Sequence, residues 1–211
     1  INNGVNVNEF VPNLYVRKLL RSEWGANDSC FLIGMVARWD IHKDHKTLLT
    51  ALSHINLKNS LPWKCILVGQ RMNYSNIELV NLLNENNLID NVILLDVRTD
   101  IPAIMSSIDL HVLSSSGEAF GNTTVEAMSC GTPAVVTNVG AGEYIVGETG
   151  WVVPSSNPIL LAESIMLAMK LKGDNCAWEK RKRSSRQRII NKFSISKMNN
   201  KYNKIWKKHA L

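Results

Sequence analysis

Short apolar runs alternate with longer segments of helical periodicity along most of the chain. Six runs, at residues 31–36, 64–69, 92–95, 109–113, 133–137 and 150–153, predict buried strands. Between them, residues 46–55, 78–88, 123–128 and 158–171 place apolar side chains at three- and four-residue steps, which predicts helices. Strands that alternate with helices are typical of right-handed βαβ units. The pattern therefore predicts an α/β protein with a Rossmann-like open parallel sheet of about six strands, flanked by helices, with further helices at the C-terminus.

The C-terminal part of the chain has a different pattern. The tail, residues 174–209, contains an amphipathic helix with a lysine-rich opposite face, because apolar side chains recur at Ile195, Met198, Tyr202, Ile205 and Trp206. The net charge of +6 also belongs to this part. Residues 170–211 carry fourteen Lys and Arg against two acids, whereas the preceding residues carry ten against sixteen. An anionic partner is therefore expected at the tail first.

Anionic lipid and nucleic acid are the two kinds of anionic partner to consider for the basic tail. A basic amphipathic helix with interfacial aromatic residues can rest on anionic lipid, although packing on protein with a solvated basic face is the commoner outcome. Nucleic acid is not expected, because the basic residues lack interleaved aromatic side chains and no nucleic-acid-binding motif accompanies them.

Composition excludes several other classes. The chain of 211 residues is 45% hydrophobic and 20% charged, as in an ordinary globular domain, and it has no run of eighteen apolar residues. Its four cysteines form no C-x-x-C pair, so buried free thiols in a reducing cytoplasm are expected. His42 and His45 lack a third ligand nearby, and no metal site is expected. The first residue is Ile1, so we interpret the chain as a piece of a longer protein.

The residues from 114 to 133, SSSGEAFGNTTVEAMSCGTP, form a strand end, a glycine turn and a helix start. Because a helix N-terminus presents unpaired N–H groups, this arrangement is suited to hold an anion between Glu118 and Glu126. Thr123-x-x-Glu126 is also a capping box, in which these two side chains only satisfy backbone donors. Both interpretations of Glu126 stay open. The sequence offers no comparable structural role for Glu118.

Three basic residues follow predicted strands. Arg38 and Lys43 lie in the loop after the first strand, where an open α/β sheet binds phosphates, and a guanidinium and an ammonium could together neutralise a diphosphate. The alternative is that both are solvated loop charges. Arg98 lies in the polar loop after the third strand, just before a helix start at Asp100 and Pro102.

These motifs resemble those of one enzyme family. Glu118 and Glu126 have seven residues between them, and EAFGNTTVEAMSCGTPAVVT is similar to the E-x7-E block of retaining, nucleotide-sugar-dependent glycosyltransferases of the GT-B fold, family 4 ("glycosyl transferases group 1"). The R-x4-K spacing of Arg38 and Lys43 resembles the diphosphate-binding pair of that family. INNGVNVNEF at the N-terminus resembles its interdomain linker, with Asn6 where the family usually has Asp.

The resemblance implies that the chain is the C-terminal, donor-binding half of a GT-B protein. Residues 1–27 would be the interdomain linker and lead-in segment, residues 28–172 the nucleotide-sugar-binding domain, and residues 173–211 the basic helical tail. The N-terminal half of the same protein would bind the acceptor.

The resemblance also implies a role for each site residue. Arg38 and Lys43 would stabilise the departing diphosphate, Glu118 would contact hydroxyl groups of the donor sugar, and Glu126 would hold the ribose. The nucleobase loop would contain Arg98. Backbone groups that meet the sugar and diphosphate would come from Phe120, Gly121, Asn122 and Thr123.

The expected function is transfer of a sugar from a UDP or GDP sugar to an acceptor hydroxyl with retention, without a metal or other cofactor, in bacterial surface polysaccharide synthesis. The resemblance places the enzyme in the cytoplasm or on the inner face of the cell membrane, and the isolated fragment would not turn over. A GT-B epimerase or phosphorylase and a non-catalytic nucleotide-binding or docking module are the alternatives. The sequence lacks G-x-G-x-x-G and G-x4-G-K-[ST], which argues against a dinucleotide dehydrogenase and a P-loop nucleotidase.

Overall fold

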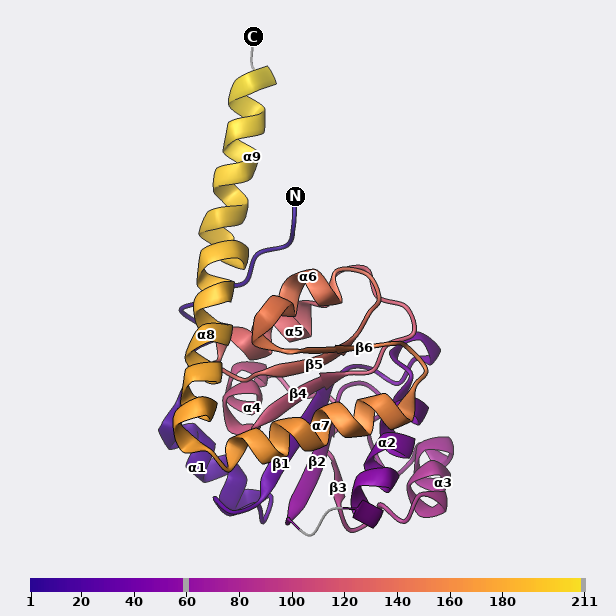
Figure 1. Ribbon diagram of the computed structural model, residues 1–211. Helices are drawn as coiled ribbons and strands as arrows, with labels where there is room; N and C mark the ends of the chain where they lie inside the picture. The colour runs from indigo at the N-terminus through magenta and orange to yellow at the C-terminus, as the bar shows by residue number, and fades with distance from the viewer. Residues whose placement is uncertain (59–60, 210–211) are drawn as a thin grey trace.

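Six parallel strands form the centre of the protein (Figure 1). The computed structural model describes residues 1–58 and 61–209. The strands are β1 (Phe31–Val36), β2 (Trp63–Val68), β3 (Val92–Leu94), β4 (Leu110–Leu113), β5 (Ala134–Thr137) and β6 (Trp151–Val153). They lie in the order β3-β2-β1-β4-β5-β6, and every neighbouring pair is parallel. The predicted open parallel sheet and its six strands are confirmed.

Helices cover both faces of this sheet (Figure 1). They are α1 (Leu14–Glu23), α2 (His45–Lys58), α3 (Ile77–Glu85), α4 (Ile101–Ser107), α5 (Asn122–Ser129), α6 (Gly142–Val146), α7 (Pro158–Lys172), α8 (Asn175–Phe193) and α9 (Ile195–His209), with the 3-10 helices η1 (Ile41–Lys43) and η2 (Gly147–Thr149). Helices α2, α3, α5 and α7 occupy the stretches that the apolar periodicity predicts, and α4 starts directly after Asp100 as expected.

The two faces of the sheet pack against separate hydrophobic clusters. In β1, Ile33 and Met35 belong to a cluster with residues of α2, α3 and α7, whereas Leu32 and Val36 belong to a cluster with residues of α1 and α4. Because successive side chains of a strand face opposite sides, the continuous apolar run of β1 fills both clusters. This burial on both faces explains why the strands read as unbroken apolar runs.

Helix α1 lies in the segment that the sequence analysis assigns to a linker and lead-in. Leu20 of this helix and Trp24 at its end are buried, but Leu14 and Leu19 are exposed, and the buried side also carries Arg21. Burial in α1 therefore does not follow its apolar pattern, because a charged residue lies on the buried side and apolar residues stay exposed.

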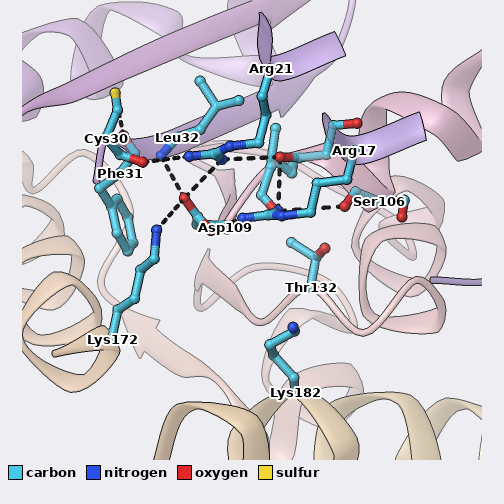
Figure 2. A network of polar contacts seen from close by, with 12 residues as sticks. Arg17, Arg21, Cys30, Phe31, Leu32, Ser106, Asp109, Thr132, Lys172 and Lys182 are labelled. Carbon is cyan, nitrogen blue, oxygen red and sulfur yellow. Dashed lines mark hydrogen bonds and ion pairs between the residues drawn. The ribbon is translucent and has the colours of Figure 1, made fainter. Parts of the chain in front are cut away.

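A buried carboxylate lies just before β4, at the amino ends of the strands (Figure 2). Asp109 accepts hydrogen bonds from Arg17 at 2.5 Å, Lys172 at 2.9 Å, Arg21 at 3.1 Å and the backbone N–H of Leu32 at 2.8 Å. Burial alone would raise the pKa of Asp109, but the three cations outweigh this effect and hold its pKa below the ordinary value. This cluster joins α1, β1, β4 and α7.

The tail contains two helices, α8 and α9, in agreement with the predicted C-terminal helices. Helix α8 ends at Phe193, the backbone of the next residue, Ser194, is extended, and α9 starts directly after it. The backbone N–H of Val5 donates to Phe193, and that of Ile195 donates to Val5, each bond within 3.0 Å. Ser194 therefore pairs with the N-terminal segment as a short parallel bridge, and this pairing interrupts the helix.

Arginines of α8 bind backbone carbonyl groups of the body. Arg186 donates to the carbonyls of Val7, Phe10 and Ser129, the last residue of α5. Arg188 donates to two carbonyls of α6, at 2.6 Å each. Two of the cations of the tail are therefore engaged in hydrogen bonds within the fold.

Helix α9 extends beyond the body of the molecule (Figure 1). Its aromatic and aliphatic residues Tyr202, Ile205 and Trp206 are exposed. Within the described residues, none of the helices has the length and apolar character that crossing a membrane requires.

Candidate functional site

The candidate site lies where the chain order of the sheet changes direction. β1 continues to β2 on one side, and β4 continues to β5 on the other, while β1 and β4 are neighbours. In open α/β sheets, ligands bind outside the carboxyl ends of the strands at such a switch point. The loops that leave these ends are residues 37–44 after β1 and residues 114–121 after β4. They carry Arg38, Lys43 and Glu118.

The first of these loops is organised by Asp40. Its side chain caps η1 by accepting from the backbone N–H of His42 at 2.9 Å. The same carboxylate accepts from Arg38, whose Nε and Nη2 lie 3.2 and 3.1 Å from Oδ2. The N–H of His42 and the Arg38 guanidinium lower the pKa of Asp40. The Arg38 side chain stays 66% exposed, so it can turn toward a ligand.

The second loop brings a carboxylate to Lys43. The Nζ atom of Lys43 forms an ion pair with Oε2 of Glu118, although the two residues are 75 positions apart in the chain. Only 23% of the Lys43 side chain and 15% of the Glu118 side chain are exposed. The expectation that Glu118 has no structural role is therefore wrong, because it holds the two loops together.

Two buried hydroxyl groups hold the Glu118 loop in place. Ser114 Oγ lies 3.0 Å from the carbonyl oxygens of both Lys43 and Asp44, to which it can donate, and Thr137 Oγ1 donates to the carbonyl of Ser115 at 2.6 Å. Both hydroxyl-bearing residues are buried at the ends of neighbouring strands. Sequence reasoning missed them, since serine and threonine after a strand are common.

A glycine contact supports the same loop. Gly140 has φ +53°, and a Cβ atom there would lie 1.9 Å from the carbonyl oxygen of Glu118. Only glycine allows this approach of the two backbones. The expected glycine turn at residues 140–143 therefore packs directly against the loop that carries Glu118, and α6 starts within it at Gly142.

Helix α5 starts after Gly121, which is its N-cap and has φ +91°. No side chain caps the helix, and Thr123 lies within it. The capping-box interpretation of Thr123 and Glu126 is therefore wrong. The N-cap position falls on Gly121, with its left-handed backbone, and not on Thr123. The first helical bonds are donated by Thr124 and Val125 to Gly121. The N–H groups of Asn122 and Thr123 precede this ladder and can meet an anion.

Glu126 faces a different neighbourhood from Glu118. It lines a pocket with Phe120, Asn122 and residues of the N-terminal segment, among them Glu9. Burial, and to a smaller degree the Glu9 carboxylate, raise the pKa of Glu126. A half-buried carboxylate in such a place is stabilised by hydrogen-bond donors, and sugar hydroxyl groups are donors of this kind.

Arg98 lies in the loop after β3. Its guanidinium donates to both carboxylate oxygens of Asp100, at 2.8 and 2.7 Å. Asp100 is the N-cap residue of α4, but its side chain makes no capping bond because it pairs with Arg98. Among the described residues, the bonds of Arg98 go to this neighbour and not to the other predicted site residues.

Other candidate chemistry does not appear in the described part of the chain. Residues 1–58 and 61–209 contain no group of three or more His, Cys, Asp and Glu side chains that could hold a metal ion. Cys30, Cys65 and Cys130 are buried free thiols, as expected, but Cys176 is exposed.

The fold and the site define a class of protein: a Rossmann-like domain with basic and acidic residues gathered at the switch point of its sheet. Comparison with known proteins gives the family. The family model for glycosyl transferases group 1 matches residues 16–188, and the chain belongs to this family. The predicted resemblance and the GT-B type of fold are confirmed.

Two curated relatives illustrate the family. A UDP-Gal:alpha-D-GlcNAc-diphosphoundecaprenol alpha-1,3-galactosyltransferase from Escherichia coli is 27% identical over 198 residues, which are 93% of this chain and 50% of that protein. The capsular polysaccharide biosynthesis glycosyltransferase CapM from Staphylococcus aureus is 29% identical over 175 residues, which are 80% of this chain and 43% of that protein. The chain thus spans about half the length of these relatives.

A solved structure shows the same fold. The crystal structure of Anabaena Alr3699/HepE in complex with UDP superposes with a TM-score of 0.84 at 23% identity, over 97% of this chain and 56% of that one.

Proposed function

We propose that this chain is the donor-binding domain of a retaining glycosyltransferase, which moves a sugar from a nucleoside diphosphate sugar to an acceptor hydroxyl in bacterial surface polysaccharide synthesis. The observation that carries the proposal is that the loops with Arg38, Lys43 and Glu118 leave the carboxyl ends of the neighbouring strands β1 and β4, where Lys43 and Glu118 pair and the second loop leads into α5. The named functions of the two relatives and the UDP complex of the Anabaena protein support the substrate class.

The proposed chemistry rests on stabilising the leaving group. When the bond between the anomeric carbon and the diphosphate breaks, negative charge develops on the diphosphate oxygens. Arg38, Lys43 and the N–H groups at the start of α5 would face this charge, and such preorganised donors lower the barrier to its formation. Glu118 would orient the sugar, and Glu126 the ribose. These groups act without a metal ion in the proposed mechanism.

The apolar face of α9 has a proposed partner as well. Ile195, Met198 and Tyr202 lie on one face, Lys197 and Lys204 lie on the opposite side of the helix, and Lys201 lies at the edge of the apolar face. Lysines opposite an apolar stripe stay solvated when protein covers the stripe. Since the chain spans about half of its relatives, the remaining half of such a protein is the proposed partner. Saturable binding of this chain to anionic vesicles would contradict that assignment.

The test is a calorimetric titration of this chain with UDP, GDP and ADP, without divalent metal. We expect saturable binding of one of them, which Arg38→Ala weakens about tenfold through loss of a charge-assisted contact. Arg183→Ala on the exposed side of α8 is the matched control, because it removes the same charge away from the site.

Two outcomes would contradict the proposal. One is the absence of binding by a chain that unfolds cooperatively and is therefore folded. The other is an equal loss of affinity in Arg38→Ala and Arg183→Ala, which would indicate attraction by net charge alone.

A further inference from the structure

The ion pair between Lys43 and Glu118 joins two residues that the proposed function assigns to different parts of the donor. Lys43 is assigned to the diphosphate and Glu118 to the sugar. In the structure each is the partner of the other, and within the described residues neither side chain has a second hydrogen-bonding partner. A diphosphate can therefore gain Lys43 only by drawing it away from Glu118.

The pair is held by more than its own attraction. The backbone N–H groups of Ser116 and Gly117 donate to the carbonyl oxygen of His42, at 2.9 and 3.3 Å. Together with the Ser114 bonds to Lys43 and Asp44, these contacts fix the two loops against each other. Loops locked in this way keep both charged groups close, so the ordering cost that weakens a surface ion pair is already met by the backbone.

The consequence differs for two ligands. A nucleoside diphosphate without a sugar would take Lys43 and leave the Glu118 carboxylate, mostly enclosed, without a cation and next to an anion. A nucleotide sugar would offer hydroxyl groups to Glu118 at the same time, so that the carboxylate keeps donors when Lys43 turns to the phosphates. An unpaired enclosed carboxylate is costly, whereas one that accepts hydroxyl donors is not.

We propose that Glu118 is a specificity-determining residue that makes the site prefer the nucleotide sugar over the bare nucleoside diphosphate, by competing with the diphosphate for Lys43. The inference rests on the proposed function. It goes further in one respect: a sugar contact alone predicts that loss of Glu118 leaves diphosphate binding unchanged, whereas competition predicts that diphosphate binding improves. After transfer, the same competition would favour release of the diphosphate product.

The experiment uses the nucleoside diphosphate among UDP, GDP and ADP that binds this chain most tightly. Calorimetry would compare its affinity for the parent chain, Glu118→Gln, Lys43→Gln and the double variant. Glutamine keeps the shape of Glu118 and cannot form an ion pair. We expect Glu118→Gln to bind the diphosphate about threefold to tenfold more tightly, the range for loss of a partly enclosed ion pair. In the Lys43→Gln background, Glu118→Gln should raise the affinity for the diphosphate no more than the loss of one negative charge elsewhere on the protein does.

General charge has its own control. Glu163→Gln removes one negative charge from the exposed side of α7 and should leave the affinity unchanged. A cooperative unfolding transition in each variant shows that the loops are still carried by a folded domain.

The outcomes separate the inference from the function on which it rests. If the parent chain binds the diphosphate and Glu118→Gln binds it equally or more weakly, the competition is overturned and the proposed function stands. The competition would also be overturned if Glu118→Gln in the Lys43→Gln background, and Glu163→Gln in the parent chain, raised the affinity as much as Glu118→Gln does in the parent chain. If the folded parent chain binds no nucleoside diphosphate, the proposed function itself is contradicted.

Discussion

The two ends of the parallel sheet use charged residues in opposite ways. At the amino ends, three cations surround one carboxylate, Asp109, whose side chain is 1% exposed. At the carboxyl ends, Arg38 pairs with Asp40 and Lys43 with Glu118, one cation to one acid, in loops that solvent reaches. A cation that leaves the buried cluster leaves an uncompensated charge behind, whereas Arg38, with its side chain 66% exposed, can leave Asp40 to solvent. The comparison indicates that the amino end contributes stability, whereas the carboxyl end keeps charged groups available for the proposed ligand.

The largest expected effect is at the amino end. Asp109→Asn would leave Arg21, 3% exposed, without its carboxylate, and we expect a loss of about 3–5 kcal/mol in the free energy of unfolding. Urea denaturation followed by circular dichroism measures this change. Asp90→Asn, at an exposed position, should stay within about 0.5 kcal/mol. A loss of similar size in both variants would remove the distinction between the two ends.

The next effect concerns two buried histidines. Burial lowers the pKa of His111 in β4 to about 3, and burial lowers that of His45 at the start of α2 to about 4. Because the unfolded chain takes up these protons near pH 6.5 and the folded chain does not, stability should fall as the pH drops below 6.5. Each histidine would contribute about 1.4 kcal/mol per pH unit at most.

This pH dependence is separable from that of Asp109. The folded pKa of Asp109 is lowered, so its contribution is present above its ordinary pKa of 3.8 and is lost only at lower pH. Between pH 6.5 and 4.5, therefore, His111→Leu should show a smaller loss of stability with acid than the parent chain. Parallel curves for the two proteins would contradict the assignment to His111.

At the carboxyl end, the expected effect is on binding and not on stability. Arg38→Ala should lower the affinity for the nucleoside diphosphate about tenfold, yet change the free energy of unfolding by less than about 0.5 kcal/mol, because its pair with Asp40 is exposed. Titration and denaturation of the same preparation measure both. A stability loss like that of Asp109→Asn would show that Arg38 is structural.

The smallest expected effect is at Glu126. If its carboxylate accepts from the ribose, Glu126→Gln should reduce the preference for a ribonucleoside diphosphate over its 2′-deoxy form by a few-fold, about the value of one hydrogen bond to a charged group. Calorimetry with both ligands measures the preference. A preference that is unchanged in the variant would remove Glu126 from ribose recognition.

The sequence predicted the strands well because most of their residues are apolar and polar turns bound them. It also predicted the loops that carry Arg38, Lys43 and Glu118, because the residue after a buried strand is at the carboxyl end of a parallel sheet. It missed α1, where a buried arginine lies beside buried apolar residues, and it did not locate the break between α8 and α9, where Ser194 pairs with Val5. These errors arise where contacts between distant segments override local periodicity.

What the sequence determined by itself was therefore the α/β class, the position of the strands and the family, since each depends on residues close together in the chain. Only the tertiary structure decided which charged and polar residues pair with each other. Lys43 meets Glu118 across 75 positions, Ser114 holds the Lys43 loop, and Asp109 gathers cations from α1 and α7. Such pairings depend on the order of the strands in the sheet. The sequence position of a charged residue therefore does not reveal which partner will lie beside it.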